Sequence, residues 1–250
     1  MRVAFCVDVE TQHYFKPSPW FSFKNKVLWN LNKLRRYRYA KNLDGLWNVF
    51  FYFSEQELPL TLFCVEPIRK KIESMFDIPK YIDVGSHSAT HNNFITMSDE
   101  ELDEEFKKIK PATSFAAPGN MIQDLNNFDR IFKKLKKKGF KIIRYQGLDV
   151  STVKKQKHSN KIEKVCSNKY LYYVWGSGYF EGTSSSTHLH NIYRKLQKNK
   201  KLSDDYIFCL STHEFTWKKN KLHILANLVQ FAQQEFKLVN FKQLVEENEK

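Results

Sequence analysis

The sequence predicts an α/β protein in which strands and helices alternate, as they do in an α/β barrel. Short apolar runs alternate with amphipathic stretches along the chain, a pattern typical of βα units around a parallel sheet. The length of 250 residues is usual for one barrel, and 42% hydrophobic residues suffice for a sizeable core. No low-complexity linker or fixed-spacing repeat divides the chain, so we expect a single domain.

The predicted elements follow from the apolar runs and the amphipathic stretches. Apolar runs predict strands at residues 3–7, 60–65, 81–84, 113–116, 140–143, 170–174, 206–210 and 237–239. Amphipathic stretches predict helices at residues 44–54, 67–76, 98–108, 125–138, 188–198 and 222–236. Ser98 and Glu101 have the spacing of a capping box, which supports the start of the third helix.

An aromatic and basic insertion at about residues 17–53 is longer than the connections that a barrel needs. The stretch from Trp20 to Arg38 interleaves aromatic and basic residues, and such a stretch can lie in a membrane interface. A helix packed over the barrel mouth would have the same composition, with buried aromatics and solvated charges. Peripheral membrane contact is therefore one of two expectations for this segment.

Charge and cysteine content restrict the partners and the compartment. The net charge of +14 permits a nucleic acid, an anionic membrane or a phosphorylated substrate. The lysines stand in solvated runs without zinc-finger or RNA-binding motifs, so we expect no nucleic-acid partner. The cysteines lack metal or redox spacing, and no signal-peptide core or apolar run of 18 residues occurs. A cytoplasmic protein with reduced thiols is expected.

Polar side chains follow the predicted strands where the strands end. These residues are Asp8 and Glu10 after the first strand, His87 and His91 after the third, and His213 after the seventh. The carboxyl ends of parallel strands share one rim, where barrel active sites lie, so we expect these side chains to converge. Packing alone is a poor explanation for a carboxylate pair, a histidine pair and a further histidine at one rim.

The histidine pair predicts a metal site. His87 and His91 are four residues apart, one helical turn, and follow Gly85, which we expect to let the chain bend sharply. Two histidines and one carboxylate leave positions open for water and substrate, as catalytic zinc sites do. Asp8 and Glu10 are two residues apart and can face the same rim, so that one binds the metal while the other accepts a proton. The residues themselves leave that division open.

The ordered motifs resemble a known family. They are Asp8-Val9-Glu10, His87-Ser88-Ala89-Thr90-His91, Ala116-Ala117-Pro118-Gly119 and Ser211-Thr212-His213. Together they are similar to the polysaccharide deacetylase superfamily, carbohydrate esterase family 4, over nearly the whole chain. The first and third motifs are similar to the branch that contains the formamido-arabinose lipid deformylases. The resemblance implies a distorted (β/α)7 barrel, a divalent metal that is usually zinc, and removal of an N-acetyl or N-formyl group from an amino sugar.

The resemblance also implies roles by position. Asp8 matches the catalytic base, and His213 matches the general acid that protonates the departing amine. Glu10, His87 and His91 match the metal ligands. The backbone N–H of Gly119 matches the second donor to the oxyanion.

One departure from the family supports a different hypothesis. Family members often place an arginine that orients the catalytic aspartate where this chain has Ala116; Arg144 or a lysine is the expected substitute. The departure favours a catalytically silent carbohydrate-binding barrel, whereas retention of both carboxylates and three histidines favours the enzyme. Hydrolysis of a non-sugar amide is a third reading. For the enzyme we expect a nucleotide sugar or a lipid-linked glycan of cell-envelope biosynthesis as the substrate.

Overall fold

A computed structural model describes residues 1–10, 43–91, 94, 97–121, 125–146, 163–164, 166–167, 171–182 and 184–249. The segment from Trp20 to Arg38, for which membrane contact was one expectation, lies outside these residues. Among the described helices, none has the length and apolar character needed to cross a membrane.

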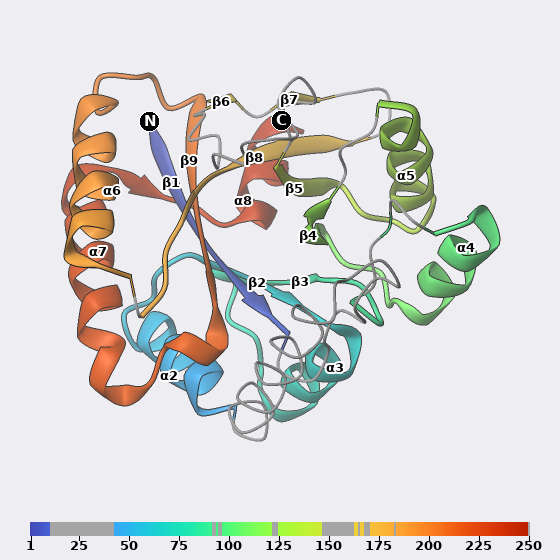
Figure 1. Cartoon of the computed structure of the whole chain (residues 1–250), viewed down its shortest axis with the longest axis horizontal. Helices are drawn as coiled ribbons and strands as arrows, with labels where there is room; N and C mark the ends of the chain where they lie inside the picture. The colour runs from blue at the N-terminus through green and yellow to red at the C-terminus, as the bar shows by residue number, and fades with distance from the viewer. Residues whose placement is uncertain are drawn as a thin grey trace, which may run out of the picture.

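Seven parallel strands form the centre of the described structure (Figure 1). They are β1 (Arg2–Val9), β2 (Leu60–Cys64), β3 (Ile82–Ser86), β4 (Ser114–Met121), β5 (Ile142–Gln146), β8 (Tyr172–Tyr179) and β9 (Tyr206–His213). Each strand pairs with the next, and β9 returns to pair with β1. The predicted (β/α)7 TIM-like barrel in a single domain is therefore confirmed. The ring is distorted between β3 and β4, which share one register pair, Ser86 with Phe115.

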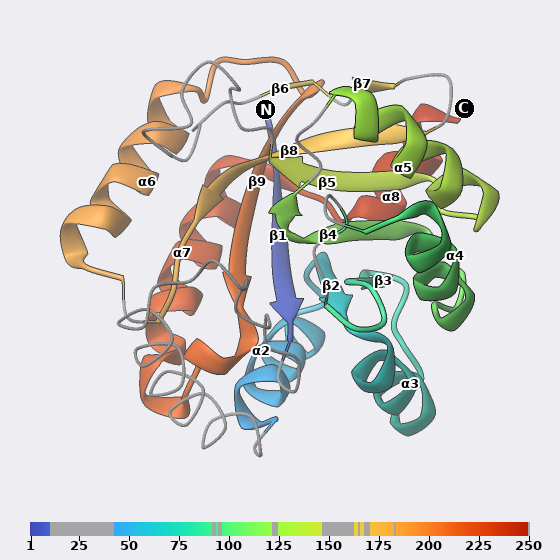
Figure 2. The ribbon, with the colours of Figure 1, turned by 45° about the vertical axis from the view of Figure 1, so that its right-hand side comes forward.

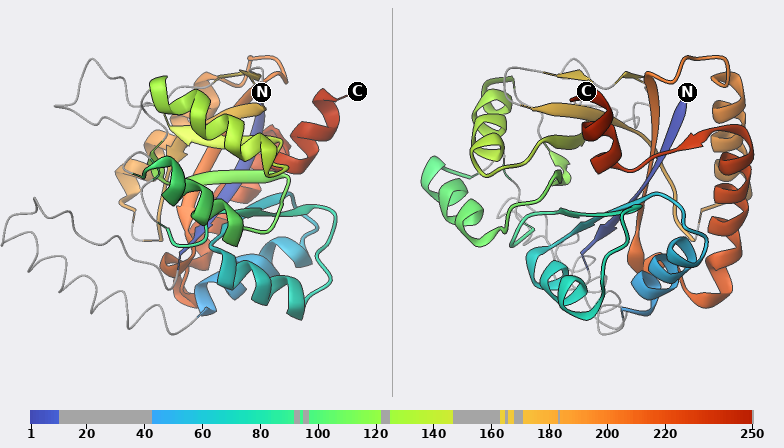
Figure 3. Two further views of the ribbon diagram at one scale, coloured as in Figure 1. Left: turned by 90° about the vertical axis from the view of Figure 1, so that its right-hand side faces the viewer. Right: turned by 180° about the vertical axis from the view of Figure 1, so that it is seen from behind.

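All but the last of the described helices lie outside the ring of strands, and the last packs against the interior cluster at the amino ends of the strands (Figures 1 and 2). The helices are α2 (Asp44–Glu55), α3 (Glu66–Met75), α4 (Asp99–Lys108), α5 (Leu125–Lys137), α6 (Ser186–Lys198), α7 (Leu222–Glu235) and α8 (Phe241–Asn248). The short elements are β6 (Glu163–Lys164), β7 (Cys166–Ser167), β10 (Lys237–Leu238) and the 3-10 turns η3 (Glu214–Thr216) and η4 (Lys219–Lys221). The capping box predicted at Ser98 is present at the start of α4. Both chain termini lie at the same end of the molecule (Figure 3).

The alternation of residues in β1 explains how the barrel interior leads to polar groups. Every residue of β1 is buried, because one face meets the barrel interior and the other meets helices. Val3, Phe5 and Val7 pack in the apolar cluster that includes α2 and α7, whereas Ala4 and Cys6 pack with interior residues of other strands. Successive residues of a strand point to opposite faces. The side chain of Asp8 therefore lies on the same interior face of β1 as Ala4 and Cys6.

The neighbouring strand β9 repeats this alternation. Cys209 lies in the interior cluster, and its Sγ is 3.4 Å from Sγ of Cys6. Residues 211 and 213, two and four positions further along β9, follow Cys209 on the same face. The interior thus changes from apolar side chains at the amino ends of the strands to polar ones at the carboxyl ends.

Gly85 does not form the sharp turn that the sequence suggested. It lies inside β3 as ordinary strand, and its lack of a side chain matters for packing instead. A Cβ at this position would lie 2.1 Å from Oγ and 2.8 Å from the carbonyl oxygen of Ser114. Glycine is required here because β4 approaches closely.

A buried carboxyl at the start of β3 predicts a pH-dependent stability. Asp83 is 4% exposed, and burial raises the pKa of its carboxyl to about 6, against nearby cations that lower it. A raised pKa in the folded state contributes stability that is present below the unfolded pKa and lost as the pH rises through 6. Between pH 4.5 and 7, the free energy of unfolding of the parent should therefore fall by about 2 kcal/mol relative to that of Asp83→Asn.

Urea unfolding at the two pH values measures this difference. Asp77→Asn is the matched control, because Asp77 is exposed. An advantage of Asp83→Asn over the parent that does not change with pH would contradict the burial of an ionisable carboxyl at this position.

Candidate active site

The register of the strands brings the predicted site residues together at one rim. Asp8 is paired directly with His213 across β1 and β9. Glu10 follows the end of β1, and His87 follows the end of β3. The ring of parallel pairs keeps these strand ends at one level. The predicted convergence of the carboxylates and the histidines is therefore present.

Three side chains form a candidate metal site. Oε1 of Glu10 lies 3.1 Å from Nε2 of His87 and 2.9 Å from Nε2 of His91. The two Nε2 atoms lie 3.2 Å apart. Ligands of a tetrahedral zinc with bonds of about 2.0–2.1 Å are separated by about 3.3 Å, so this triangle of atoms is close to the spacing that such an ion requires.

The hydrogen bond of His87 also fits a metal ligand. Its Nδ1 donates to the carbonyl oxygen of Ala116 at 2.9 Å. This bond leaves Nε2, the atom that faces Glu10 and His91, as the ring nitrogen that can bind an ion. Burial acts to raise the pKa of Glu10, but the three surrounding histidines hold it well below its ordinary value, so the carboxylate is ionised.

The segment that carries the two histidines is not the helical turn expected from their spacing. Residues 87–91 contain no helix, and Ser88 and His91 have positive φ angles of 74° and 57°. Left-handed backbone is uncommon for residues with side chains and is found at functional sites. The Ser88 Oγ accepts a hydrogen bond from the His91 N–H at 2.9 Å and stabilises this tight turn. The imidazoles meet because the chain folds back on itself.

Asp8 has a different partner from Glu10. Its Oδ2 accepts a hydrogen bond from the guanidinium of Arg144 at 2.7 Å, and Arg144 also donates to Ser211 Oγ at 3.1 Å. Burial acts to raise the pKa of Asp8, but Arg144 and the nearby histidines lower it below its ordinary value. Within the described residues, Asp8 Oδ1 has no hydrogen-bond partner. One oxygen is thus held in place while the other is available to accept a proton.

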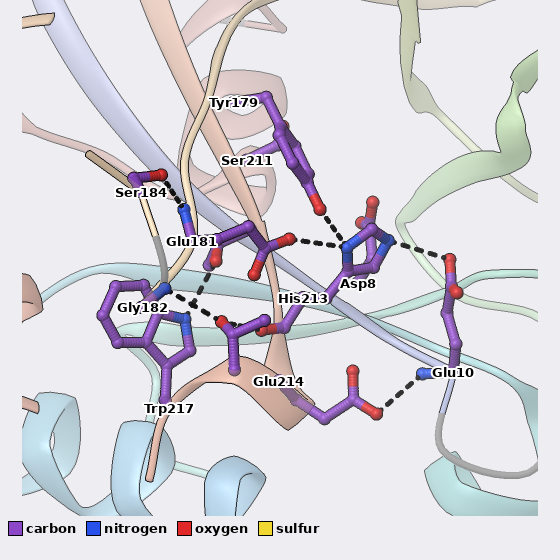
Figure 4. A network of polar contacts seen from close by, with 12 residues as sticks. Asp8, Glu10, Tyr179, Glu181, Gly182, Ser184, Ser211, His213, Glu214 and Trp217 are labelled. Atoms are coloured by element: carbon purple, nitrogen blue, oxygen red, sulfur yellow. Dashed lines mark hydrogen bonds and ion pairs between the residues drawn. The ribbon is translucent and has the colours of Figure 1, made fainter. Parts of the chain in front are cut away.

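His213 connects Glu10 with a second acidic residue (Figure 4). Its Nε2 lies 3.4 Å from Glu10 Oε1, and its Nδ1 lies 2.8 Å from Glu181 Oε1. The Tyr179 hydroxyl also contacts Nδ1. Burial acts to lower the pKa of His213, but the carboxylates of Glu10 and Glu181 raise it well above its ordinary value. The imidazole is therefore held in the protonated state, as a general acid requires.

Glu181 and Glu214 were not predicted from the sequence. Glu181 follows β8, which continues to Tyr179 although the sequence suggested an end at residue 174. Gly176 and Gly178 interrupt the apolar run, and the pairing of β8 with β9 shifts register there. Glu214 follows His213 directly, and its Oε1 accepts a hydrogen bond from the Glu10 backbone N–H at 3.2 Å. Glu214 is buried in the structure, and nothing in the sequence indicates that burial.

The motif around Pro118 lies in β4. Ala116, Ala117 and Pro118 are buried, and the pairing with β5 shifts register between Ala116 and Met121. Gly119 is within this irregular part of the strand, near the carboxyl end of the barrel.

The sequence matches no protein-family model and no curated protein. Solved structures are similar in fold. A protein from Mycobacterium smegmatis described as a polysaccharide deacetylase has a TM-score of 0.65 and 13% identity, covering 98% of this chain and 89% of that one. The PuuE allantoinase has a TM-score of 0.53 and 10% identity, with coverage of 95% and 86%.

A third structure is a mutant CE4 family pseudoenzyme with restored enzymatic activity. It has a TM-score of 0.50 and 12% identity, and it covers 98% of this chain and 67% of that one. Identities this low show a common fold and nothing more. The chain therefore shares its barrel fold with a polysaccharide deacetylase, an allantoinase and a CE4 family pseudoenzyme.

Proposed function

We propose that this protein is a metal-dependent amidohydrolase that removes an N-acetyl or N-formyl group from an amino sugar. The observation that carries the proposal is the convergence of Glu10, His87 and His91 beside Asp8 and His213. The ligand triangle has the spacing of a catalytic metal site, and the two further groups have the protonation states that a base and an acid need. The polysaccharide deacetylase of similar fold supports the sugar substrate.

The residues divide the reaction between them. Glu10, His87 and His91 would hold the divalent metal, which when bound polarises the acyl carbonyl and acidifies water. Asp8, fixed by Arg144, accepts the proton from the attacking water through Oδ1. His213, kept protonated by Glu181, delivers a proton to the nitrogen of the departing amine. The backbone N–H of Gly119 is the proposed second donor to the oxyanion.

The finer features of the proposal rest on the sequence. Zinc is the proposed metal, because two histidines and one carboxylate are ligands that catalytic zinc sites use. The proposed substrate is a nucleotide sugar or a lipid-linked glycan of cell-envelope biosynthesis. Placement in the formamido-arabinose branch stays a prediction.

A catalytically silent barrel is the alternative function. One similar structure is a mutant, with restored activity, of a protein described as a CE4 family pseudoenzyme, and this description supports considering the alternative. The loss of arginine at position 116 was the observation that favoured this alternative. Arg144 contacts Asp8 directly. The absence of arginine at position 116 therefore no longer favours the silent barrel over the enzyme.

Removal of the histidine pair should abolish metal binding. We expect near-stoichiometric zinc in the parent and its loss in His87→Ala/His91→Ala, because the double mutant retains one carboxylate of the triangle. Metal content is measured by elemental analysis, together with acetate and formate release from N-acylated sugars. His190→Ala/His223→Ala, which removes two exposed histidines of α6 and α7, is the matched control.

The results separate the enzyme from its alternatives. Acid release that follows the metal supports the enzyme, and the acid released distinguishes a deacetylase from a deformylase. Metal without acid release from any sugar would favour the silent barrel. Absence of metal after zinc is added back would refute the site.

Isosteric substitutions should separate the roles of the two carboxylates. Asp8→Asn should retain zinc and lower kcat/KM by about 10²–10⁴-fold, because a general base is lost. Glu10→Gln should lose zinc, because a neutral amide is a poorer ligand than a carboxylate. Zinc titration and steady-state kinetics on both variants test this division. The opposite pattern, with zinc lost in Asp8→Asn, would exchange the assigned roles.

A further inference from the structure

A buried carboxylate on α4 contacts the turn between the two metal histidines. Glu105 is 2% exposed and lies on the buried face of the helix with Leu102 and Phe106. Its neighbour Glu104 is exposed and pairs with Lys107 at the surface. A charged side chain with so little exposure is stable only when hydrogen bonds replace its water.

Within the part of the chain that the structure describes, the hydrogen bonds that Glu105 accepts come from two residues of the histidine turn. Oε1 of Glu105 accepts from the backbone N–H groups of Ala89 and Thr90, each at 2.7 Å. Oε2 accepts from the hydroxyl of Thr90 at 2.7 Å. These three short bonds, made to an ionised acceptor, are of the strong kind. They join α4 to the residues that stand between His87 and His91.

The turn needs such support because of its backbone conformation. Ser88 and His91, on either side of the two bonded residues, both have left-handed φ angles. Left-handed backbone is unfavourable for L-residues and persists where surrounding contacts determine it. The Ser88 carbonyl accepts from Glu66 N–H at 3.1 Å, which holds the turn from the side of α3. Glu105 holds it from the side of α4.

We infer that Glu105 is a positioning residue for the metal site, an inference that rests on the proposed function. By fixing the N–H groups of Ala89 and Thr90, its carboxylate sets the turn that points His87 and His91 at one ion. Attachment of α4 to the barrel does not require this carboxylate, because Leu102 and Phe106 pack in the apolar cluster with Phe115. The carboxylate acts on the geometry of the turn.

Substitution of Glu105 should therefore change metal affinity separately from stability. Glu105→Ala should raise the Kd for zinc at least about tenfold, the range seen when residues that orient metal ligands are lost. Glu105→Gln should restore most of the affinity, because its amide oxygen can accept from both N–H groups while its NH₂ donates to Thr90. The absorption spectrum of cobalt-loaded Glu105→Ala should differ from that of the cobalt-loaded parent, whereas the spectrum of Glu105→Gln should match it.

Two control variants separate a local role from a general one. Leu102→Ala, one turn earlier on α4 and fully buried, weakens the packing of α4 on the barrel but removes no hydrogen bond to the turn. Glu104→Ala removes an exposed carboxylate beside Glu105. Both should bind zinc with the affinity of the parent at a temperature at which every variant is folded.

The outcomes decide the inference independently of the proposed function. An unchanged Kd in Glu105→Ala, or an equal loss in Leu102→Ala, would overturn it. Should the parent bind neither zinc nor cobalt, the proposed function fails instead. Hydrogen exchange of the Ala89 and Thr90 amides then tests the anchoring directly. Faster exchange in Glu105→Ala, but not in Leu102→Ala, supports the anchoring, and unchanged exchange refutes it.

Discussion

The pairing of β1 with β9 is the interaction on which the site depends. It joins the first and last strands of the ring from Arg2 to Asp8, and it sets Asp8 directly opposite His213. A shift of this register by one residue would turn Asp8 away from the barrel interior, because side chains alternate along a strand. The proposed base and the proposed acid are thus brought together by backbone pairing between segments that lie far apart in the sequence. Their placement follows from closure of the barrel.

The partners of the carboxylates explain why similar groups at one rim can have different chemistry. Asp8 faces a guanidinium, which is charged at every relevant pH and has no lone pair to offer an ion. Glu10 faces Nε2 of His87 and Nε2 of His91, and each of these nitrogens can offer a lone pair to an ion. Glu181 lies on the far side of His213 and adds negative charge there. A cation is therefore expected to bind best at Glu10, whereas the carboxylates on both sides of His213 favour its protonated form.

The sequence predicted the residues of this site better than their local structure. Alternation in β1 and the polar residues at strand ends were enough to place Asp8, Glu10 and His213 at one rim. The turn at His87 was misjudged, because a four-residue spacing also suits a helix and a positive φ at Ser88 has no sequence signal outside glycine. Glu181 was missed because Gly176 and Gly178 interrupt the apolar run of β8, so the strand was predicted to end too early. Glu105 was missed because a buried glutamate in an acidic helix resembles its exposed neighbours.

The position of Arg144 shows how a guanidinium reaches Asp8 although the chain has Ala116 where the resemblance places an arginine. The resemblance led us to expect arginine at position 116, where the chain has alanine. Ala116 in β4 is the register partner of Arg144 in β5, and adjacent strands lie about 4.8 Å apart. An arginine on either strand therefore starts at the same level of the barrel, and its long side chain spans the difference. Both residues are fully buried, so the small side chain at one position leaves space for the large one at the other. In this chain Arg144 on β5 supplies the guanidinium at Asp8, beside the position on β4 where the resemblance places one.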